Sequence, residues 1–148
     1  MALPPLYDPI LVQPMRDELT TAGVQELTTP EQVDAAMAQP GTTLVFVNSV
    51  CGCAAGSARP GLRLAMQHTV QPDRVVSVFA GMDREAVDRA RSYFLGYPPS
   101  SPQIALLRDG QVIHMIPRHQ IEGRSAQMIA EHLADTFNTH CAVGAATN

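Results

Sequence analysis

The sequence predicts a single α/β domain: a central mixed β-sheet flanked by helices, with an N-terminal helical extension. Three observations predict this class. Strand-like apolar runs alternate with segments whose apolar residues recur at helical spacing. An Asp-Gly pair at positions 109–110, a typical hairpin signal, joins the last two runs and makes the sheet mixed. The 148 residues suffice for one domain, 1–148, with its own core.

The first elements lie before residue 40. A helix is predicted over residues 9–19, where apolar side chains recur every three or four positions and Gly23 follows as a stop. A short strand at 24–27 comes next. Thr29 then caps a second helix, which has Pro30 at its first position.

The middle of the chain carries two buried strands and two helices. An apolar strand at 43–47 leads into a helix over 53–70. The segment Arg59-Pro60-Gly61 interrupts this helix, and Pro60 should kink it. The run 75–80 is apolar and rich in β-branched residues, as in a strand buried on both faces. A helix over 83–96 follows it.

The last third contains the hairpin and the closing helix. Strands at 103–107 and 112–116 flank the Asp-Gly turn, and an amphipathic helix follows over 125–137. Residues 142–148 are predicted to be a frayed tail.

Composition excludes several classes of function. The net charge is −4, and the ten basic residues, all arginines, are dispersed, which argues against a nucleic-acid surface. The apolar stretches are too short to span a bilayer, so we expect no membrane segment. The N-terminus lacks the features of a signal peptide, and three cysteines do not make a secreted disulfide framework. We therefore expect a protein of the reducing cytosol.

The segment Cys51-Gly52-Cys53 places two thiols where the apolar strand gives way to a run of small residues. The thiolate is the nucleophilic form of cysteine, and the unpaired N–H groups of a helix N-terminus favour it. Cys51 is therefore the candidate nucleophile. A disulfide across one intervening residue should be strained and readily reduced, and Gly52 is the residue best able to absorb the distortion.

Other interpretations of the two thiols remain open at this point. They could be unrelated buried cysteines, a structural disulfide or half of a metal site. Cys141 and the five histidines could complete a metal site only through the fold.

The chain resembles the bacilliredoxin family, whose members are thioredoxin-like. The likeness rests on residues 47–56 (VNSVCGCAAG), 96–102 (GYPPSSP) and 118–124 (RHQIEGR), and it covers nearly the whole chain. It implies a thioredoxin-like fold and a bacterial thiol–disulfide oxidoreductase that acts on proteins capped by bacillithiol, a cytosolic low-molecular-weight thiol. Weak disulfide isomerase activity is also implied.

By this resemblance Cys51 attacks the mixed disulfide, and Cys53 or a second bacillithiol resolves the adduct. Catalysis would rest on Cys51 and Cys53 alone, with bacillithiol or another low-molecular-weight thiol as co-substrate and with no cofactor or metal ion. Client proteins with bacillithiolated or disulfide-bonded cysteines would be the partners.

The resemblance also implies substrate-binding residues. Pro102 matches the proline that thioredoxin-like proteins hold in cis, which would present the backbone of Ser101 to an extended substrate beside Gly52. Arg118 and His119 are weaker candidates for stabilising the thiolate or binding a carboxylate, and a solvated turn explains them equally well. Arg59 is expected to point away from the thiols, and Cys141 to be a free thiol.

Two further classes of function compete with the enzyme. One is a carrier of metal or persulfide that uses Cys51 and Cys53, and the other is an interaction module without turnover. The strand at 42–48 contains no carboxylate to accept a proton from the second thiol, and tryptophan is absent, which argues against efficient thioredoxin-like reduction.

Overall fold

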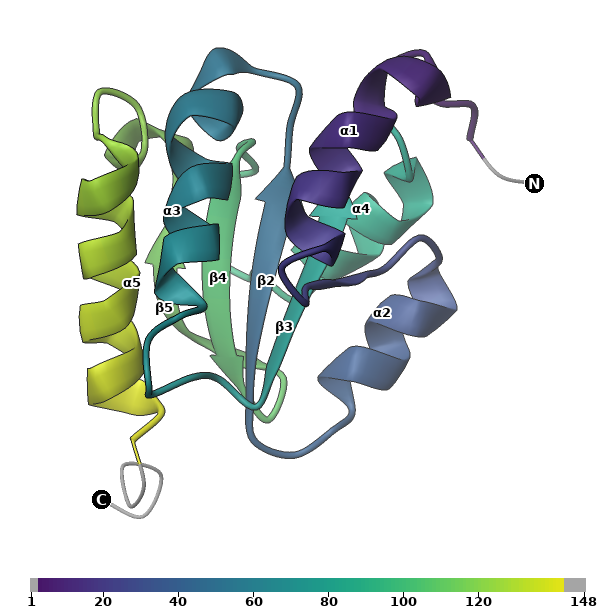
Figure 1. Ribbon diagram of the computed structural model, residues 1–148. Helices are drawn as coiled ribbons and strands as arrows, with labels where there is room; N and C mark the ends of the chain where they lie inside the picture. Colours follow the sequence, from purple (N-terminus) through teal and green to yellow (C-terminus); the bar gives the residue numbers. More distant parts are fainter. Residues whose placement is uncertain (1–2, 143–148) are drawn as a thin grey trace.

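The computed structural model describes residues 3–142 and shows a mixed five-stranded β-sheet between two layers of helices (Figure 1). The strands are β1 (Gln25–Glu26), β2 (Thr42–Asn48), β3 (Arg74–Phe79), β4 (Gln103–Arg108) and β5 (Gln111–Ile116). The α-helices are α1 (Pro9–Thr20), α2 (Pro30–Met37), α3 (Arg59–Ala65), α4 (Arg84–Ser92) and α5 (Ala126–His140). These elements confirm the predicted fold class.

The strand order is β1-β3-β2-β4-β5, so β2 lies at the centre. Strands β1 and β2 both pair with β3 in parallel, whereas β4 is antiparallel to β2 and β5 is antiparallel to β4. Every residue of β2 is buried, as its apolar run predicts. Because β2 is the central strand, its carboxyl end lies in the middle of one edge of the sheet, and the cysteine turn follows there.

Two hydrophobic clusters hold the layers together. One packs α2 and α4 against side chains such as Val45, Val76 and Leu107. The other packs α1, α3 and α5 against the opposite face, where Phe46 and Leu106 lie. Figure 1 shows α3 and α5 side by side over that face.

The helix predicted over 53–70 differs most from expectation. Its first part is a π-helical turn at Ala54–Ala58, and regular α-helix begins only at Arg59 and ends at Ala65. Pro60 has no N–H group to donate to the carbonyl four residues before it, and Arg59 N–H donates five residues back, to Ala54. The wide π-helical turn therefore accommodates Pro60 within a continuous helical segment.

Two other differences are smaller. The last helix continues to His140 rather than ending at residue 137, and Cys141 is its C-cap. A 3₁₀ turn, Arg118–Gln120, occupies part of the segment predicted as a plain turn. Of the predicted tail, only Ala142 belongs to the described part of the chain.

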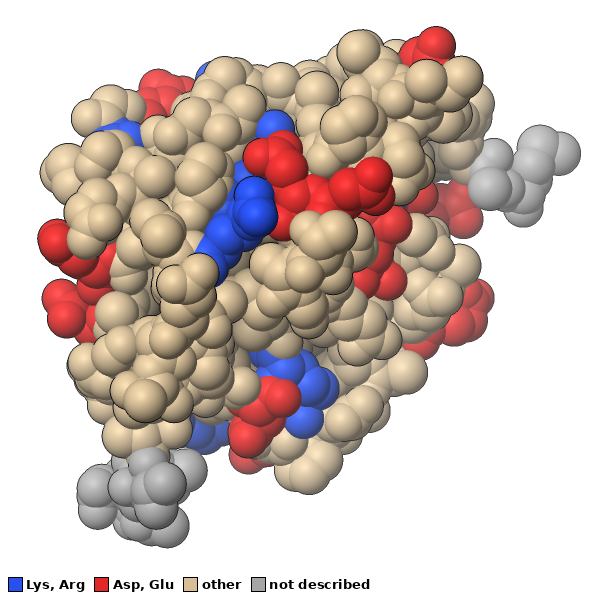
Figure 2. All heavy atoms as spheres, in the orientation of Figure 1, with Lys and Arg blue, Asp and Glu red and all other residues tan. Residues whose placement is uncertain are grey.

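Charges are mixed on the face drawn in Figure 2, where basic side chains are scattered among acidic ones. Within residues 3–142, no helix has the length and apolarity that crossing a membrane would need.

Candidate active site

The two thiols lie where β2 ends and the helical segment begins. Gly52 and Cys53 already have helical backbone, and the N–H groups of Ala54 and Ala55 donate to the Cys51 carbonyl at 3.1 and 3.2 Å. Cys51 is thus at the N-terminal end of the segment. The two Sγ atoms are 2.7 Å apart, within hydrogen-bonding distance, and both cysteines are free thiols.

The surroundings separate the two thiols in acidity. Burial by itself would raise the pKa of Cys51, but hydrogen bonds from the Cys53 thiol, the Ala54 N–H and the Ser49 hydroxyl outweigh it, so the pKa of Cys51 lies below the ordinary value. Burial, the hydrogen bond to Cys51 and the charge of a Cys51 thiolate all raise the pKa of Cys53. Cys51 is therefore the more acidic thiol of the pair and the first of the two to lose its proton.

Gly52 adopts no left-handed backbone, and a Cβ built on it would meet nothing within 4 Å. The expectation that this glycine absorbs the distortion of a Cys51–Cys53 disulfide is not tested by the reduced pair. What the structure shows is that Gly52 is exposed between the two cysteines, with open space where a side chain would begin.

Arg59 contacts neither thiol, but its side chain packs against the residues that precede the cysteine pair. The residue is only 1% exposed. Its Nη1 donates to Asn48 Oδ1 at 3.0 Å and to the Ser49 carbonyl at 2.7 Å, while Nε pairs with Glu18 at 2.7 Å. The π-helical turn inserts extra backbone before Arg59, which rotates this residue relative to a regular helix. Arg59 thereby fixes the loop that carries Cys51.

Asn48 and Ser49 complete this anchor, and sequence reasoning did not single them out. Asn48 Oδ1 accepts from the Ser49 N–H at 2.9 Å, and Ser49 Oγ accepts from the Cys51 N–H at 3.2 Å. Both residues are buried. Two polar residues directly after an apolar strand, with an arginine among the small and apolar residues of the next helix, are the sequence signal that could have revealed them.

The peptide bond between Ser101 and Pro102 is cis, as predicted. Val47 pairs with Gln103 across the sheet, so Pro102 lies next to the end of β2 from which the cysteine loop departs. The Ser101 carbonyl accepts from Arg118 Nη1 at 3.2 Å. A substrate that pairs with Ser101 through this carbonyl must therefore share it with Arg118.

Of the two weaker candidates, Arg118 and His119, only Arg118 acts on the thiols. Arg118 also forms an ion pair with Glu122, and its positive charge acts on both thiols, lowering the pKa of Cys53. His119 is exposed and lines a different cavity of about 300 Å³ beside Tyr97 and Pro98. It is not among the groups that shift the pKa of Cys51 or Cys53.

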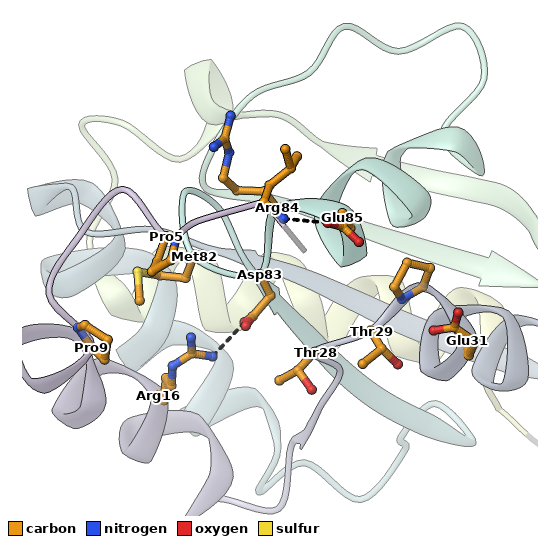
Figure 3. A pocket seen from close by; sticks show the side chains of 12 residues that line it. Pro5, Pro9, Arg16, Thr28, Thr29, Glu31, Met82, Asp83, Arg84 and Glu85 are labelled. Carbon is orange, nitrogen blue, oxygen red and sulfur yellow. Dashed lines mark hydrogen bonds and ion pairs between the residues drawn. The ribbon is translucent and has the colours of Figure 1, made fainter. Parts of the chain in front are cut away.

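A larger cavity, of about 420 Å³, lies between the N-terminal segment and the starts of α2 and α4 (Figure 3). Neither cysteine nor histidine lines it. The half-buried Arg16 points at Asp83, with the ion pair at 2.8 Å, and also pairs with Glu26 at 3.1 Å. This cavity supplies no nucleophile, so the thiol pair is the candidate reactive centre.

Cys141 is remote from this centre. Its sulfur is hydrogen-bonded to Thr42, the first residue of β2, whereas the other two cysteines follow the last. Burial raises the pKa of Cys141. It is a free thiol, as predicted, and its place excludes it from direct exchange with Cys51 within one molecule.

Comparisons with known proteins bear on the whole chain. Residues 7–141 match the model of a family described as disulphide isomerase. A bacilliredoxin from Cytophaga hutchinsonii is 57% identical over 133 residues, 90% of this chain and 98% of the relative. A bacilliredoxin from Koribacter versatilis is 53% identical over 137 residues, 92% of this chain and 94% of the relative.

Among solved structures, the thioredoxin of Malassezia sympodialis matches with a TM-score of 0.58 at 15% identity, covering 81% of this chain and 92% of that chain. At this identity the likeness concerns the fold, which is the thioredoxin fold with an added N-terminal helix.

Proposed function

Because the chain belongs to the bacilliredoxin family, we propose that it is a thiol–disulfide oxidoreductase that removes bacillithiol from protein mixed disulfides. The family and the fold support an oxidoreductase of thiols. The observation that carries the proposal is the pair of free thiols 2.7 Å apart, with the pKa of Cys51 lowered and that of Cys53 raised.

The first step is attack by the Cys51 thiolate on the bacillithiol sulfur of the mixed disulfide. The bond between that sulfur and the client cysteine breaks, and the client leaves as a thiolate. A disulfide between Cys51 and bacillithiol forms, so one disulfide replaces another and no external oxidant or reductant is needed. The open space above Gly52 gives the substrate sulfur access to Cys51.

The second step follows from the change of charge at Cys51. While Cys51 is a thiolate, its negative charge raises the pKa of Cys53 and keeps that thiol protonated. Once Cys51 is in the adduct, that charge is gone and the attraction of Arg118 remains, so Cys53 loses its proton more readily. The Cys53 thiolate can then attack Cys51 Sγ, which forms a Cys51–Cys53 disulfide and releases bacillithiol. Alternatively, a second bacillithiol attacks the bacillithiol sulfur of the adduct, which forms bacillithiol disulfide and frees the Cys51 thiolate.

Ser101 and Pro102 are proposed to contact the client, and Arg118 to hold an anionic group of the low-molecular-weight thiol. The motivation is that Arg118 lies against both the Ser101 carbonyl and the thiols. Weak disulfide isomerase activity through the same pair and a cytosolic location belong to this proposal, with bacillithiol as the only co-substrate. The description of the matched family supports the isomerase activity.

Single-turnover mass spectrometry with a bacillithiolated model protein tests the proposal. Cys51→Ala should leave the substrate unchanged, with a rate reduced by about 10³ or more, because it lacks the nucleophile. Cys53→Ala should release the client once and gain one bacillithiol on Cys51. Cys141→Ala is the matched control and should behave as the unmodified protein.

Two outcomes would contradict the proposal in different ways. If Cys53→Ala were as inactive as Cys51→Ala in one turnover, the separate roles of the two sulfurs would be wrong. If a glutathione mixed disulfide reacted as fast as the bacillithiol one, the exchange chemistry would stand and the assignment of the low-molecular-weight thiol would fall.

A further inference from the structure

His114 of β5 and His132 of α5 face each other at the edge of the molecule, apart from the thiols. Their Nε2 atoms are 3.0 Å apart, and the two rings meet edge to face with centroids 5.2 Å apart. Both side chains are half-buried. Neither residue has a role in the proposed exchange reaction.

The fold directs both rings to this meeting point. A β-bulge shifts the β4–β5 register between Leu106 and Leu107, so that His114 lies opposite Leu106. Cross-strand neighbours share a face, and Leu106 belongs to the cluster covered by α3 and α5. His132 comes directly before Leu133 in α5, and Leu133 is fully buried in that cluster. The bulge thus aims His114 at α5.

The environment favours the neutral form of both imidazoles. Burial lowers the pKa of His114, and the nearby rings of His132 and His140 lower it further. Burial and the charge of Arg124 lower the pKa of His132, while Asp135 opposes them. Neutral imidazole is the form that ligates metal ions. In the observed contact one ring carries its proton on Nε2, and moving that proton to Nδ1 leaves both Nε2 lone pairs free.

The spacing of the two nitrogens fits one ion. With metal–nitrogen bonds of about 2.1 Å, two atoms 3.0 Å apart subtend an angle of about 90° at the metal. This is the angle between neighbouring ligands in octahedral or square-planar coordination, which Ni²⁺ and Cu²⁺ favour with nitrogen ligands. We propose that His114 and His132 form a two-histidine site for a divalent transition-metal ion.

The other histidines nearby are not ligands of this proposed site. The His140 ring lies 6.3 Å from that of His114, and His68 is already hydrogen-bonded to Asn138 at 2.9 Å. Across residues 3–142, no three histidine, cysteine or acidic side chains are grouped to hold a metal ion. Water therefore completes the coordination, and the bound ion would link the edge strand β5 to α5.

Ni²⁺ is the probe, because it does not oxidise thiols as Cu²⁺ does. The full chain is first alkylated with iodoacetamide, which removes the three cysteines as competing ligands, and Ni²⁺ binding is measured by calorimetry. His114→Gln and His132→Gln should each weaken binding about a hundredfold, since each leaves one ligand of the chelating pair. His68→Gln is the matched control and should leave the affinity unchanged.

A second measurement needs no substitution in the pair. In proton NMR spectra of the alkylated protein, paramagnetic Ni²⁺ should broaden the ring signals of His114 and His132 before those of His68 and His119. Binding should also raise the melting temperature, because the ion binds only the folded chain. The proposal is overturned if Ni²⁺ does not bind, if His68→Gln weakens binding as much as His114→Gln, or if other histidine signals broaden first.

Discussion

The thiols at the two ends of β2 differ in the helix terminus to which each is attached. Cys51 follows the carboxyl end of the strand and stands at the start of a helical segment. Cys141 is the C-cap of α5 and lies against Thr42 at the amino end of the strand. The pKa of Cys51 is lowered, whereas burial raises that of Cys141.

The comparison indicates that hydrogen-bond donors, rather than burial, set the direction in which the pKa of each thiol is shifted. Burial opposes the thiolate at both sites. At Cys51, N–H groups of the helix start, a hydroxyl and a second thiol stabilise the negative charge. A helix C-terminus presents carbonyl groups instead, which repel an anion. The pKa values of these two cysteines are therefore shifted in opposite directions.

The largest expected effect comes from removing the anchor of the Cys51 loop. Arg59→Ala would leave Asn48 Oδ1 and the Ser49 carbonyl without their buried donor, so the free energy of unfolding should fall by about 3 kcal/mol. The loosened loop should also slow alkylation of Cys51 towards the rate of Cys141. Urea unfolding and mass-mapped alkylation measure the two effects.

Arg63→Ala is the matched control for Arg59, because Arg63 is an exposed arginine of the same helix. It should change the free energy of unfolding by no more than roughly 0.5 kcal/mol. Equal losses in the two variants would show that Arg59 has no special role in holding the loop.

The contrast between the thiols can be measured directly with iodoacetamide. Near neutral pH, Cys51 should react at least about ten times faster than Cys141, because alkylation follows the thiolate fraction. As pH rises, the rate of Cys51 should reach its midpoint below the pKa of an ordinary cysteine, and that of Cys141 above it.

Unfolding the chain in urea should make the two alkylation rates converge, which provides the control for the effect of the fold. If Cys141 or Cys53 were labelled before Cys51 in the folded, reduced protein, Cys51 would not be the thiolate of the pair.

The smallest effect concerns the charge beside the pair. Arg118→Gln removes a cation that lowers the pKa of Cys53, so that pKa should rise and attack by Cys53 on the Cys51 adduct should slow roughly threefold. The effect is small because the Arg118 side chain is 44% exposed. Rapid-quench mass spectrometry follows the conversion of the adduct.

Arg118→Lys retains the charge and should resolve the adduct at nearly the rate of the unmodified protein. If Gln and Lys at this position slowed resolution equally, the hydrogen bond to Ser101, rather than the charge, would be what Arg118 contributes.

The resemblance to a known family implied the cis bond before Pro102. The sequence alone was enough to predict the order of the elements, the hairpin and the thiol pair, because these features depend on local signals. Apolar periodicity predicts strands and helices, Asp109-Gly110 predicts the hairpin turn, and Cys51-Gly52-Cys53 follows directly on a strand. Membership of the bacilliredoxin family was likewise recognisable from three short segments of the chain.

Features that depend on contacts between distant residues could not be predicted in this way. The sequence did not predict that Arg59 is buried against Asn48 and Ser49, because a regular helix was assumed where the chain forms a π-helical turn. The separation of Arg118 from His119 depends on a 3₁₀ turn that has no distinct sequence signal.

The sequence by itself was enough to identify the residues proposed to carry the chemistry, since two thiols at a strand-to-helix turn are a local arrangement. Only the tertiary structure decided how the surroundings divide their roles. Arg59 comes from another turn of the helical segment and Arg118 from beyond the hairpin, and they meet the cysteine loop only because the sheet brings its ends together. The same holds for His114 and His132, which a β-bulge and a packed helix place 3.0 Å apart. Local periodicity contains no information on such distances, because they are fixed by packing across the whole core.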